Sequence, residues 1–262
     1  MLLAIDAGNT NVVFGLFEGD TKRCQWRAAT RADRTADEYA ALLTQWLTLE
    51  GLTPASVKNV VIASVVPRLL RDLRLLSEKV FHCKPMVIGD EGIVLGIEVK
   101  YRKDEIGSDR LADAIAAHVA YKGPLIVIDF GTATTFNVVD ENGNYCGGAI
   151  APGVNLTLEA LHAAAAKLPR ITIEEPKRTI GLDTVSAMNS GIYWGYIGLI
   201  EGLTDRIKAE LGGASKIKVV ATGGLAPLFA HGTKVVDHVD PDLTLRGLVE
   251  IFRRNARAAS KG

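Results

Sequence analysis

Cysteine is scarce in this sequence, which has only three among 262 residues. Cys24, Cys83 and Cys146 lie far apart, and no two cysteines form a CxxC pair. An odd number of widely spaced cysteines argues against a disulfide framework and against a cysteine zinc site. Scattered thiols of this kind are typical of a reducing compartment.

The sequence also lacks net charge, since 30 basic residues balance 30 acidic ones. Proteins that bind nucleic acid through its phosphates normally carry a basic excess, so no nucleic-acid partner is expected. No apolar run approaches the roughly 18–20 residues of a membrane span. The N-terminal apolar segment has no basic region and is interrupted by Asp6, unlike a signal peptide. We therefore expect a cytoplasmic protein that does not enter a membrane.

Several common catalytic signatures are absent from the sequence. It contains neither the GxxxxGK[ST] phosphate loop nor the GxGxxG dinucleotide fingerprint. Its five histidines form no HExxH pair. The composition is 48% hydrophobic and 23% charged, which is typical of a folded globular protein. The length fits one large domain or two small ones.

Strand and helix patterns alternate along the first third of the chain. Thr35 and Glu38 form a capping box ahead of apolar residues at helical spacing, which predicts a helix over 36–50. A short β-branched run predicts a strand over 59–64. The pattern continues with a helix over 68–81 and a strand over 85–88, and this alternation indicates an α/β fold.

The middle of the chain repeats its beginning. LLAIDAGNTNVVFGLF near the N-terminus and PLIVIDFGTATTFNVVD further on both read as strand, Asp-x-Gly turn and strand. Asp6 corresponds to Asp129, and Gly8 to Gly131. The remaining patterns predict a helix that follows AIAPGV and runs through 168, helices over 184–211 and 243–259, and a strand over 217–220. This two-fold duplication predicts two similar α/β lobes.

Three turns carry the residue types that bind phosphate. In the turns beginning at Asp6 and Asp129, glycine permits close backbone approach, while hydroxyl groups and turn N–H groups can donate to phosphate oxygens. A strand-end Asp can hold Mg²⁺ through water. The third turn, Thr222-Gly223-Gly224, leaves backbone open to a nucleotide. Each turn alone is equally compatible with an ordinary hairpin or strand–helix turn, whereas the combination is more specific.

The same motifs give the chain a family resemblance. The sequence resembles the superfamily of acetate and sugar kinases, heat-shock chaperones and actin, and within it the type III pantothenate kinases. The matching segments are Asp6–Asn11, Ala63–Pro67, Ile106–Arg110, Ile128–Thr135, Gly147–Gly153, Thr222–Gly224 and Asp240–Leu248. Together they span essentially the whole chain. Ser108 stands where the family commonly has Ala, and Ala7 where it has Val or Ile.

The resemblance implies duplicated ribonuclease-H-like lobes, as in actin-like ATPases, with an ATP cleft between them. We place these lobes at 1–114 and 115–262. It also implies Mg²⁺ and a potassium or ammonium ion as cofactors. Asp129 would hold the monovalent cation, and Asp6 is the candidate for water-mediated Mg²⁺. The implied ATP-binding residues are Asp6, Ala7, Gly8, Asn9, Thr10, Asn11, Val12, Val13 and Thr132.

Asp109 follows Gly107 where a helix begins, so capping of that helix is one interpretation. The resemblance instead makes Asp109 the general base for the substrate hydroxyl, since phosphoryl transfer needs one carboxylate to orient the nucleophile. Arg110 is either a solvated surface charge or a fork for the substrate carboxylate. The pantothenate-binding residues that the resemblance implies are Tyr101, Gly107, Ser108, Asp109, Arg110 and Thr184.

The expected activity is transfer of the ATP γ-phosphate to pantothenate, giving 4′-phosphopantothenate, the first step of coenzyme A synthesis. The alternatives are a superfamily kinase acting on another small alcohol and a catalytically silent regulatory homologue. Glycines at 191, 195, 198 and 202 mark one face of the helix expected over 184–211. This face suggests helix packing across a two-fold axis in a homodimer, with packing inside one lobe as the alternative. Thr184, at the start of this helix, is either its N-cap or, as the family resemblance implies, a residue that contacts pantothenate and reaches across such an interface.

Overall fold

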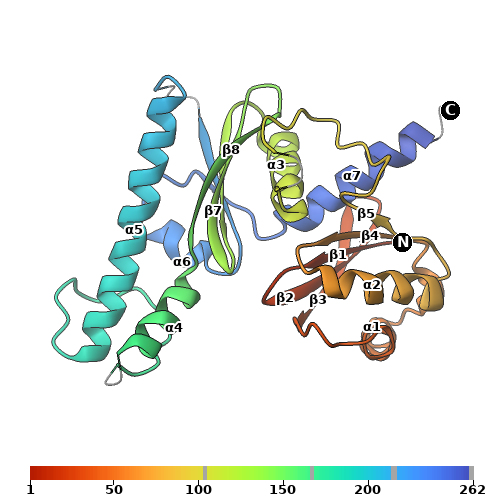
Figure 1. Cartoon of the computed structure of the whole chain (residues 1–262), viewed down its shortest axis with the longest axis horizontal. Coiled ribbons are helices and arrows are strands. Elements are labelled where there is room, and N and C mark those ends of the chain that lie inside the picture. The colour runs from red at the N-terminus through yellow and green to blue at the C-terminus, as the bar shows by residue number, and fades with distance from the viewer. Residues whose placement is uncertain (103–104, 166–167, 214–216, 260–262) are drawn as a thin grey trace. The chain divides into compact units, whose positions relative to one another are not determined.

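The computed structural model describes residues 1–102, 105–165, 168–213 and 217–259 (Figure 1). The contacts between residues divide the chain into two compact units. The first unit comprises Met1–Ile97, Arg102–Ala116 and Leu243–Gly262, and the second comprises Glu98–Tyr101 and Ala117–Asp242. The C-terminal segment therefore packs with the first unit. The lobe boundary between residues 114 and 115 stays a prediction.

A mixed sheet forms the centre of the first unit. Its strands, in spatial order, are β3 (Thr21–Ala29), β2 (Asn11–Glu18), β1 (Leu2–Ala7), β4 (Asn59–Ser64) and β5 (Met86–Val87). β1, β2 and β3 pair antiparallel as a meander, whereas β4 lies parallel to β1, and β5 parallel to β4. The parallel pairs need crossovers, and helices supply them.

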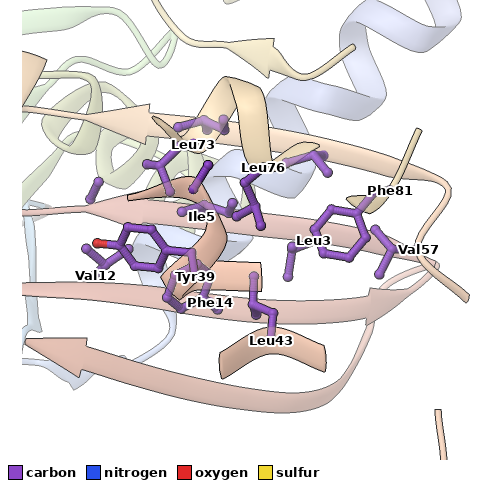
Figure 2. Packing of buried hydrophobic residues seen from close by; sticks show 14 of the residues in the cluster. Leu3, Ile5, Val12, Phe14, Tyr39, Leu43, Val57, Leu73, Leu76 and Phe81 are labelled. Carbon is purple, nitrogen blue, oxygen red and sulfur yellow. The ribbon is translucent and has the colours of Figure 1, made fainter. Parts of the chain in front are cut away.

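Helices cover both faces of this sheet. On one face lie α1 (Ala36–Leu49) and α2 (Pro67–Val80), with the short 3-10 helix η1 (Pro54–Ser56) between them in sequence. Figure 2 shows this core, in which side chains of β1 and β2, such as Ile5 and Phe14, meet Tyr39 and Leu73 from the helices. On the other face lie α3 (Ser108–Tyr121) and α7 (Leu243–Ala259).

The second unit repeats the strand order of the first. In spatial order its strands are β8 (Tyr145–Pro152), β7 (Ala133–Val139), β6 (Leu125–Phe130), β9 (Lys218–Thr222) and β10 (His238–Val239). β6, β7 and β8 again form an antiparallel meander, with β9 parallel to β6 and β10 parallel to β9. Two ribonuclease-H-like lobes of the same topology confirm the predicted fold class.

The helices of the second unit are α4 (Val154–Ala164), α5 (Thr184–Glu210) and α6 (Ala226–His231). They pack on one face of the sheet (Figure 1). Phe136, Tyr193 and Phe229 are fully buried in this layer. The apolar side chains that α4, α5 and α6 present to the strands account for the layer.

Several details of the secondary structure differ from the sequence-based expectations, and β8, α6 and β10 are among the elements that were not predicted. The helix expected to reach residue 168 ends at Ala164, and residue 165 is already extended. Thr184 is not the cap of α5, because the Asp183 side chain accepts the Ser186 N–H and caps the helix. Strand β3 was not predicted, since its charged, alternating sequence gives a weak signal at a sheet edge.

Candidate active site

Asp6 lies at the carboxyl end of β1, beside the equivalent end of β4. Its register partners are Val13 on β2 and Ala63 on β4. The side chain is partly buried, whereas the four residues before it in the strand are buried in the core. The parallel arrangement of β1 and β4 brings their carboxyl ends to one edge of the sheet, which is where ligands bind in open α/β sheets.

The turn after β1 is held in place by backbone and hydroxyl hydrogen bonds. The Gly8 N–H donates to the Asn11 carbonyl at 3.0 Å. Thr30 on the neighbouring segment donates twice, from its N–H to Thr10 O at 2.9 Å and from its hydroxyl to Gly8 O at 2.6 Å. The side chains of Asn9 and Thr10 stay exposed. The turn thus presents polar groups to solvent on a fixed backbone.

The predicted ATP-binding residues between Ala7 and Val13 differ in how deeply they are buried. Ala7 and Val12 are buried in the core, so only their backbone groups can meet a ligand. Val13 is partly buried and packs on the opposite face of the sheet. Asn11 is partly buried as the first residue of β2. The exposed side chains among the predicted ATP-binding residues of this segment are those of Asn9 and Thr10.

Asp109 reaches the same edge of the sheet through the start of α3. The Ser108 hydroxyl oxygen accepts the backbone N–H of Ser64, the last residue of β4, at 3.0 Å. This bond fixes the first turn of α3 beside the end of β4. A side chain at Gly107 would meet Asp109 Oδ1 and the Val65 methyl group, so glycine leaves the space that the Asp109 carboxylate fills.

The environment of Asp109 favours a proton on its carboxyl group. Burial, the largest influence, raises the pKa of Asp109. The Arg110 N–H, which donates to Asp109 Oδ1 at 2.8 Å, and the Arg110 charge oppose this rise only in part. A carboxylate that is partly desolvated and moderately basic has the properties of a general base.

Arg110 is not the solvated surface charge that one interpretation allowed. Arg110 is only 9% exposed and directly follows Asp109 in sequence. Burial of a guanidinium is costly unless partners satisfy it. One turn further along α3, Asp113 is 1% exposed and accepts a hydrogen bond from the Thr244 hydroxyl at 2.7 Å. This bond ties α3 to α7 close to Asp109.

In the second unit, Asp129 occupies the position that Asp6 has in the first. Each is the fifth residue of a six-residue strand with the same order of buried and partly buried positions. Asp129 has Thr135 and Thr222 as register partners, as Asp6 has Val13 and Ala63. The duplicated sequence motif therefore corresponds to a duplicated structural position.

Two glycines enclose the Asp129 carboxylate. A Cβ at Gly223, whose φ is +90°, would lie 2.6 Å from Asp129 Oδ1 and 2.7 Å from the Phe130 carbonyl oxygen. A Cβ at Gly131 would lie 3.3 Å from Asp129 Oδ2. Both oxygens thus face backbone that has no side chain. Carboxylate and carbonyl oxygens gathered in this way suit a hard cation.

Thr132 follows in the turn between β6 and β7 and is exposed. The Gly131 N–H donates to the Ala133 carbonyl at 3.1 Å, which closes the turn. Gly153, just after β8, leaves room for the backbone of this turn, because a Cβ there would strike Thr132 O. Thr132 is thereby held on a tightly packed backbone at an exposed position.

Tyr101 and Thr184 also belong to the second unit. The Tyr101 ring is 40% exposed and meets the buried Tyr145 ring edge-on, with centroids 6.1 Å apart. Thr184 is the exposed first residue of α5. Among the described residues no hydrogen bond or ion pair joins these two side chains. The structure therefore does not link Thr184 to Tyr101 within one chain.

A protein-only metal centre is not found in the described part of the chain, where no group of three or more His, Cys, Asp or Glu could hold an ion. Single carboxylates at Asp6 and Asp129 are compatible with ions whose other ligands are phosphate, water or backbone oxygens. Within the described residues no helix is long and apolar enough to cross a membrane.

Comparisons with known proteins address the family of the chain. A family model described as type III pantothenate kinase matches residues 2–206. The type III pantothenate kinase of Paramagnetospirillum magneticum is 61% identical over 98% of this chain and 98% of its own length. That of Rhodospirillum rubrum is 60% identical over 97% of this chain and 99% of its own length. The chain belongs to the type III pantothenate kinase family.

Solved structures with the same fold are much more distant in sequence. A Campylobacter jejuni protein described as a Baf family transcriptional activator has a TM-score of 0.60 at 17% identity, covering 97% of this chain and 99% of its own. A Sinorhizobium meliloti protein described as a 2-dehydro-3-deoxygalactonokinase has a TM-score of 0.59 at 16% identity, covering 98% and 96%. At such identities the likeness concerns the fold alone.

The sequence did not reveal what surrounds the predicted residues. Tyr145 and Asn137 were not singled out, although both are fully buried and form a polar cluster behind Tyr101. Asp140 and Lys100 were not singled out either, and they form an ion pair at 2.8 Å. The sequence gives no local sign of this ion pair, because 40 residues separate Lys100 from Asp140 and the two meet only in the folded chain.

Proposed function

We propose that this chain is an ATP-dependent pantothenate kinase, which transfers the γ-phosphate of ATP to the primary hydroxyl group of pantothenate. The product, 4′-phosphopantothenate, begins coenzyme A synthesis. The observation that carries the proposal is the match to pantothenate kinases over nearly the full chain. We further propose that the enzyme acts in the cytoplasm, without a nucleic-acid partner.

In this proposal Asp109 receives the proton of the attacking hydroxyl group. Its support is the carboxylate held at the sheet edge by Ser108 and Gly107, with a pKa raised by burial. A base with a raised pKa accepts a proton more readily once the hydroxyl oxygen attacks phosphorus. Arg110, immediately beside it, would bind the carboxylate of pantothenate as a bidentate fork. Tyr101 would contact the pantothenate chain.

The ATP phosphates would be bound by the turn residues that follow the two equivalent carboxylates. Asn9 and Thr10 in the first unit and Thr132 in the second are exposed at these turns. Their hydroxyl and amide groups, together with turn N–H groups, can donate to phosphate oxygens. Phosphoryl transfer depends mainly on such positioning and on charge neutralisation.

Two cations fit the carboxylates of the site. Asp6 would hold Mg²⁺ through water, since Mg²⁺ keeps several waters and takes few protein ligands. Asp129, whose two carboxylate oxygens lie beside the backbone of Gly223 and Gly131, would hold potassium or ammonium. When bound, these cations neutralise the negative charge of the phosphates.

A homodimer is the third part of the proposal. Gly191, Gly195 and Gly198 are exposed on one face of α5, with open space where their side chains would be. Trp194 lies on the same face and is 37% exposed. Small residues let helices approach closely, and a two-fold axis would pair this face with itself. Thr184, at the start of α5, would then reach the pantothenate site of the partner copy.

The dimer is tested by Gly195→Leu, which adds a bulky side chain to the exposed face and leaves the core untouched. Sedimentation equilibrium should show a dimer for the wild type and a monomer for the variant. Ala41→Leu, at an exposed helical position of α1 in the first unit, is the matched control and should stay dimeric. A wild-type monomer, or a Gly195→Leu dimer of unchanged affinity, would contradict the interface.

The activity itself is tested with a panel of acceptors. The protein is incubated with Mg-ATP and, separately, with pantothenate, pantetheine, glycerol or a hexose, and the products are identified by mass spectrometry and ³¹P NMR. A phosphomonoester formed on pantothenate alone supports the proposal. Transfer to another alcohol in preference would favour the alternative superfamily kinase. ATP binding without any transfer would favour a silent regulatory homologue.

A further inference from the structure

A short segment of the second unit leads directly into Tyr101. The 98–101 strap comprises residues Glu98 to Tyr101 and runs parallel to the start of β8, with Val99 opposite Tyr145. The Tyr145 N–H donates to Glu98 O at 2.9 Å, and the Lys100 N–H donates to Tyr145 O at 2.8 Å. These two backbone bonds are the main-chain attachment of the strap to the sheet.

The strap is also fastened through side chains to the loop between β7 and β8. Lys100 Nζ donates to Asp140 Oδ2 at 2.8 Å, and the Glu98 N–H donates to Asn144 Oδ1 at 2.9 Å. Asp140 in turn accepts the backbone N–H groups of Asn142 and Asn144, each at 2.9 Å. The loop is thereby folded around one carboxylate, which meets the Lys100 ammonium group.

The Asp140 carboxyl group is ionised at physiological pH. Burial alone would raise the pKa of Asp140, but the hydrogen bonds from Lys100, Asn144 and Asn142 outweigh it and lower the pKa to about 2. The Lys100 partner responds in the opposite direction, since its hydrogen bond to Asp140 raises the pKa of Lys100. Both groups are therefore charged whenever the enzyme works.

Beneath the strap lies a buried polar chain. The Tyr145 hydroxyl donates to Asn137 Oδ1 at 3.1 Å, and Asn137 Nδ2 donates to the Thr135 hydroxyl at 3.1 Å. Thr135 is the register partner of Asp129. Tyr145 and Asn137 are completely buried, so these hydrogen bonds hold both side chains in fixed positions beneath residues 98–101. The Tyr101 ring packs edge-on against the Tyr145 ring and lies next to Gly147.

We propose that Lys100 and Asp140 are positioning residues for pantothenate, because their ion pair holds the 98–101 strap and so fixes the Tyr101 ring before the substrate arrives. The inference rests on the proposed function, in which Tyr101 contacts pantothenate. In this proposal the ion pair affects pantothenate binding only through the position of Tyr101. A contact that is ordered in advance spares binding the entropy of ordering it.

The expected effect is specific to one kinetic constant. Lys100→Met keeps the length and much of the apolar stem of the side chain but removes the charge that Asp140 binds. Because the pair is partly exposed, we expect the pantothenate KM to rise by about two- to fivefold. The ATP KM and kcat should change by less than about 1.5-fold, since only substrate binding is affected.

Two further variants separate positioning from general stability. Lys100→Arg retains a cation for Asp140 and should restore a pantothenate KM close to that of the wild type. Arg74→Met removes the Arg74–Asp90 ion pair, which has similar N–O distances of 2.7 and 2.8 Å and comparable exposure but lies in the first unit. It should lower the melting temperature about as much as Lys100→Met and leave the pantothenate KM unchanged.

The proposal is overturned if Lys100→Met leaves the pantothenate KM unchanged, or if Arg74→Met raises it equally. Tyr101→Ala distinguishes this failure from failure of the proposed substrate site. An increase in the pantothenate KM for Tyr101→Ala, with none for Lys100→Met, rejects the positioning role and keeps the site. No increase for either variant rejects Tyr101 as a pantothenate contact, and the positioning role with it.

Discussion

Replacement of the Asp109 carboxyl group by an amide is the change that most directly probes the proposed chemistry. Asp109→Asn keeps the size and shape of the side chain, and its amide oxygen can still accept the Arg110 N–H. The bond between Ser108 and Ser64 that places the start of α3 is unaffected. What the variant loses is the ability to take a proton from the substrate.

The size of the loss follows from that role. General bases contribute typically 10²–10⁴-fold to a rate, so kcat should fall by about that factor. Such a fall corresponds to about 3–5 kcal/mol of activation free energy. The KM for ATP should stay within about twofold, because Asp109 does not bind the phosphates in this account.

The free energy of unfolding of Asp109→Asn should not fall along with its activity. Burial raises the pKa of Asp109, so between its ordinary and its raised pKa the folded protein binds a proton that the unfolded chain does not. The free energy of unfolding therefore falls as pH rises through that window and stays lower above it. An amide carries no charge and escapes this loss. At neutral pH the variant should be at least as stable as the wild type.

The assay combines steady-state kinetics with thermal unfolding between pH 4 and 9. For the wild type, kcat/KM for pantothenate should rise with pH through the raised pKa of Asp109 and then level off. The variant should lack this rise. Turnover close to that of the wild type would refute Asp109 as the base. A large drop in melting temperature together with the loss of activity would instead make Asp109 a structural capping residue.

Three further predictions concern Arg110 in the first unit and Gly223 and Asp140 in the second. Arg110→Met should raise the pantothenate KM by about 10–100-fold, as expected for a charge-assisted hydrogen bond, and equal rises for both substrates would mark a structural role. Gly223→Ala should displace the Asp129 carboxylate and weaken activation by potassium. Gly212→Ala, at a position with φ +88° and open space, is the control and should leave potassium activation unchanged. An equal loss of potassium activation in both variants would contradict a cation site at Asp129. Asp140, with a pKa of about 2, should contribute stability that is full above about pH 4 and is lost toward pH 2. Unfolding of Asp140→Asn should lack that part of the acid dependence, and an unchanged pH profile would contradict the bonding around this carboxylate.

Much of the fold could be predicted because its signals are local. The capping box at Thr35 and Glu38 predicted the start of α1, and both of its hydrogen bonds are present. The repeated strand–turn–strand pattern predicted the duplication, since Asp6 and Asp129 end equivalent strands. The parallel neighbours β4 and β9 lie where the alternation of strands and helices implies. Edge strand β3 escaped notice because it buries few of its side chains.

The sequence identifies candidate site residues but not the groups that hold them in place. Motif residues such as Asp109 are visible in sequence because glycine and acidic residues stand at an element boundary. The groups that hold them are not visible, since Ser64 meets Ser108, and Lys100 meets Asp140, only after the chain has folded. Burial of Arg110 was likewise hidden, because the sequence gives no local signal that α7 packs against α3.

The central claim is that pantothenate accepts the phosphate, and ADP release tests it most directly. The purified protein is given Mg-ATP with and without pantothenate, each in potassium and in sodium buffer. The account predicts ADP formation that requires pantothenate and is faster in potassium. ADP released at the same rate without pantothenate, or no release in any buffer, would contradict it.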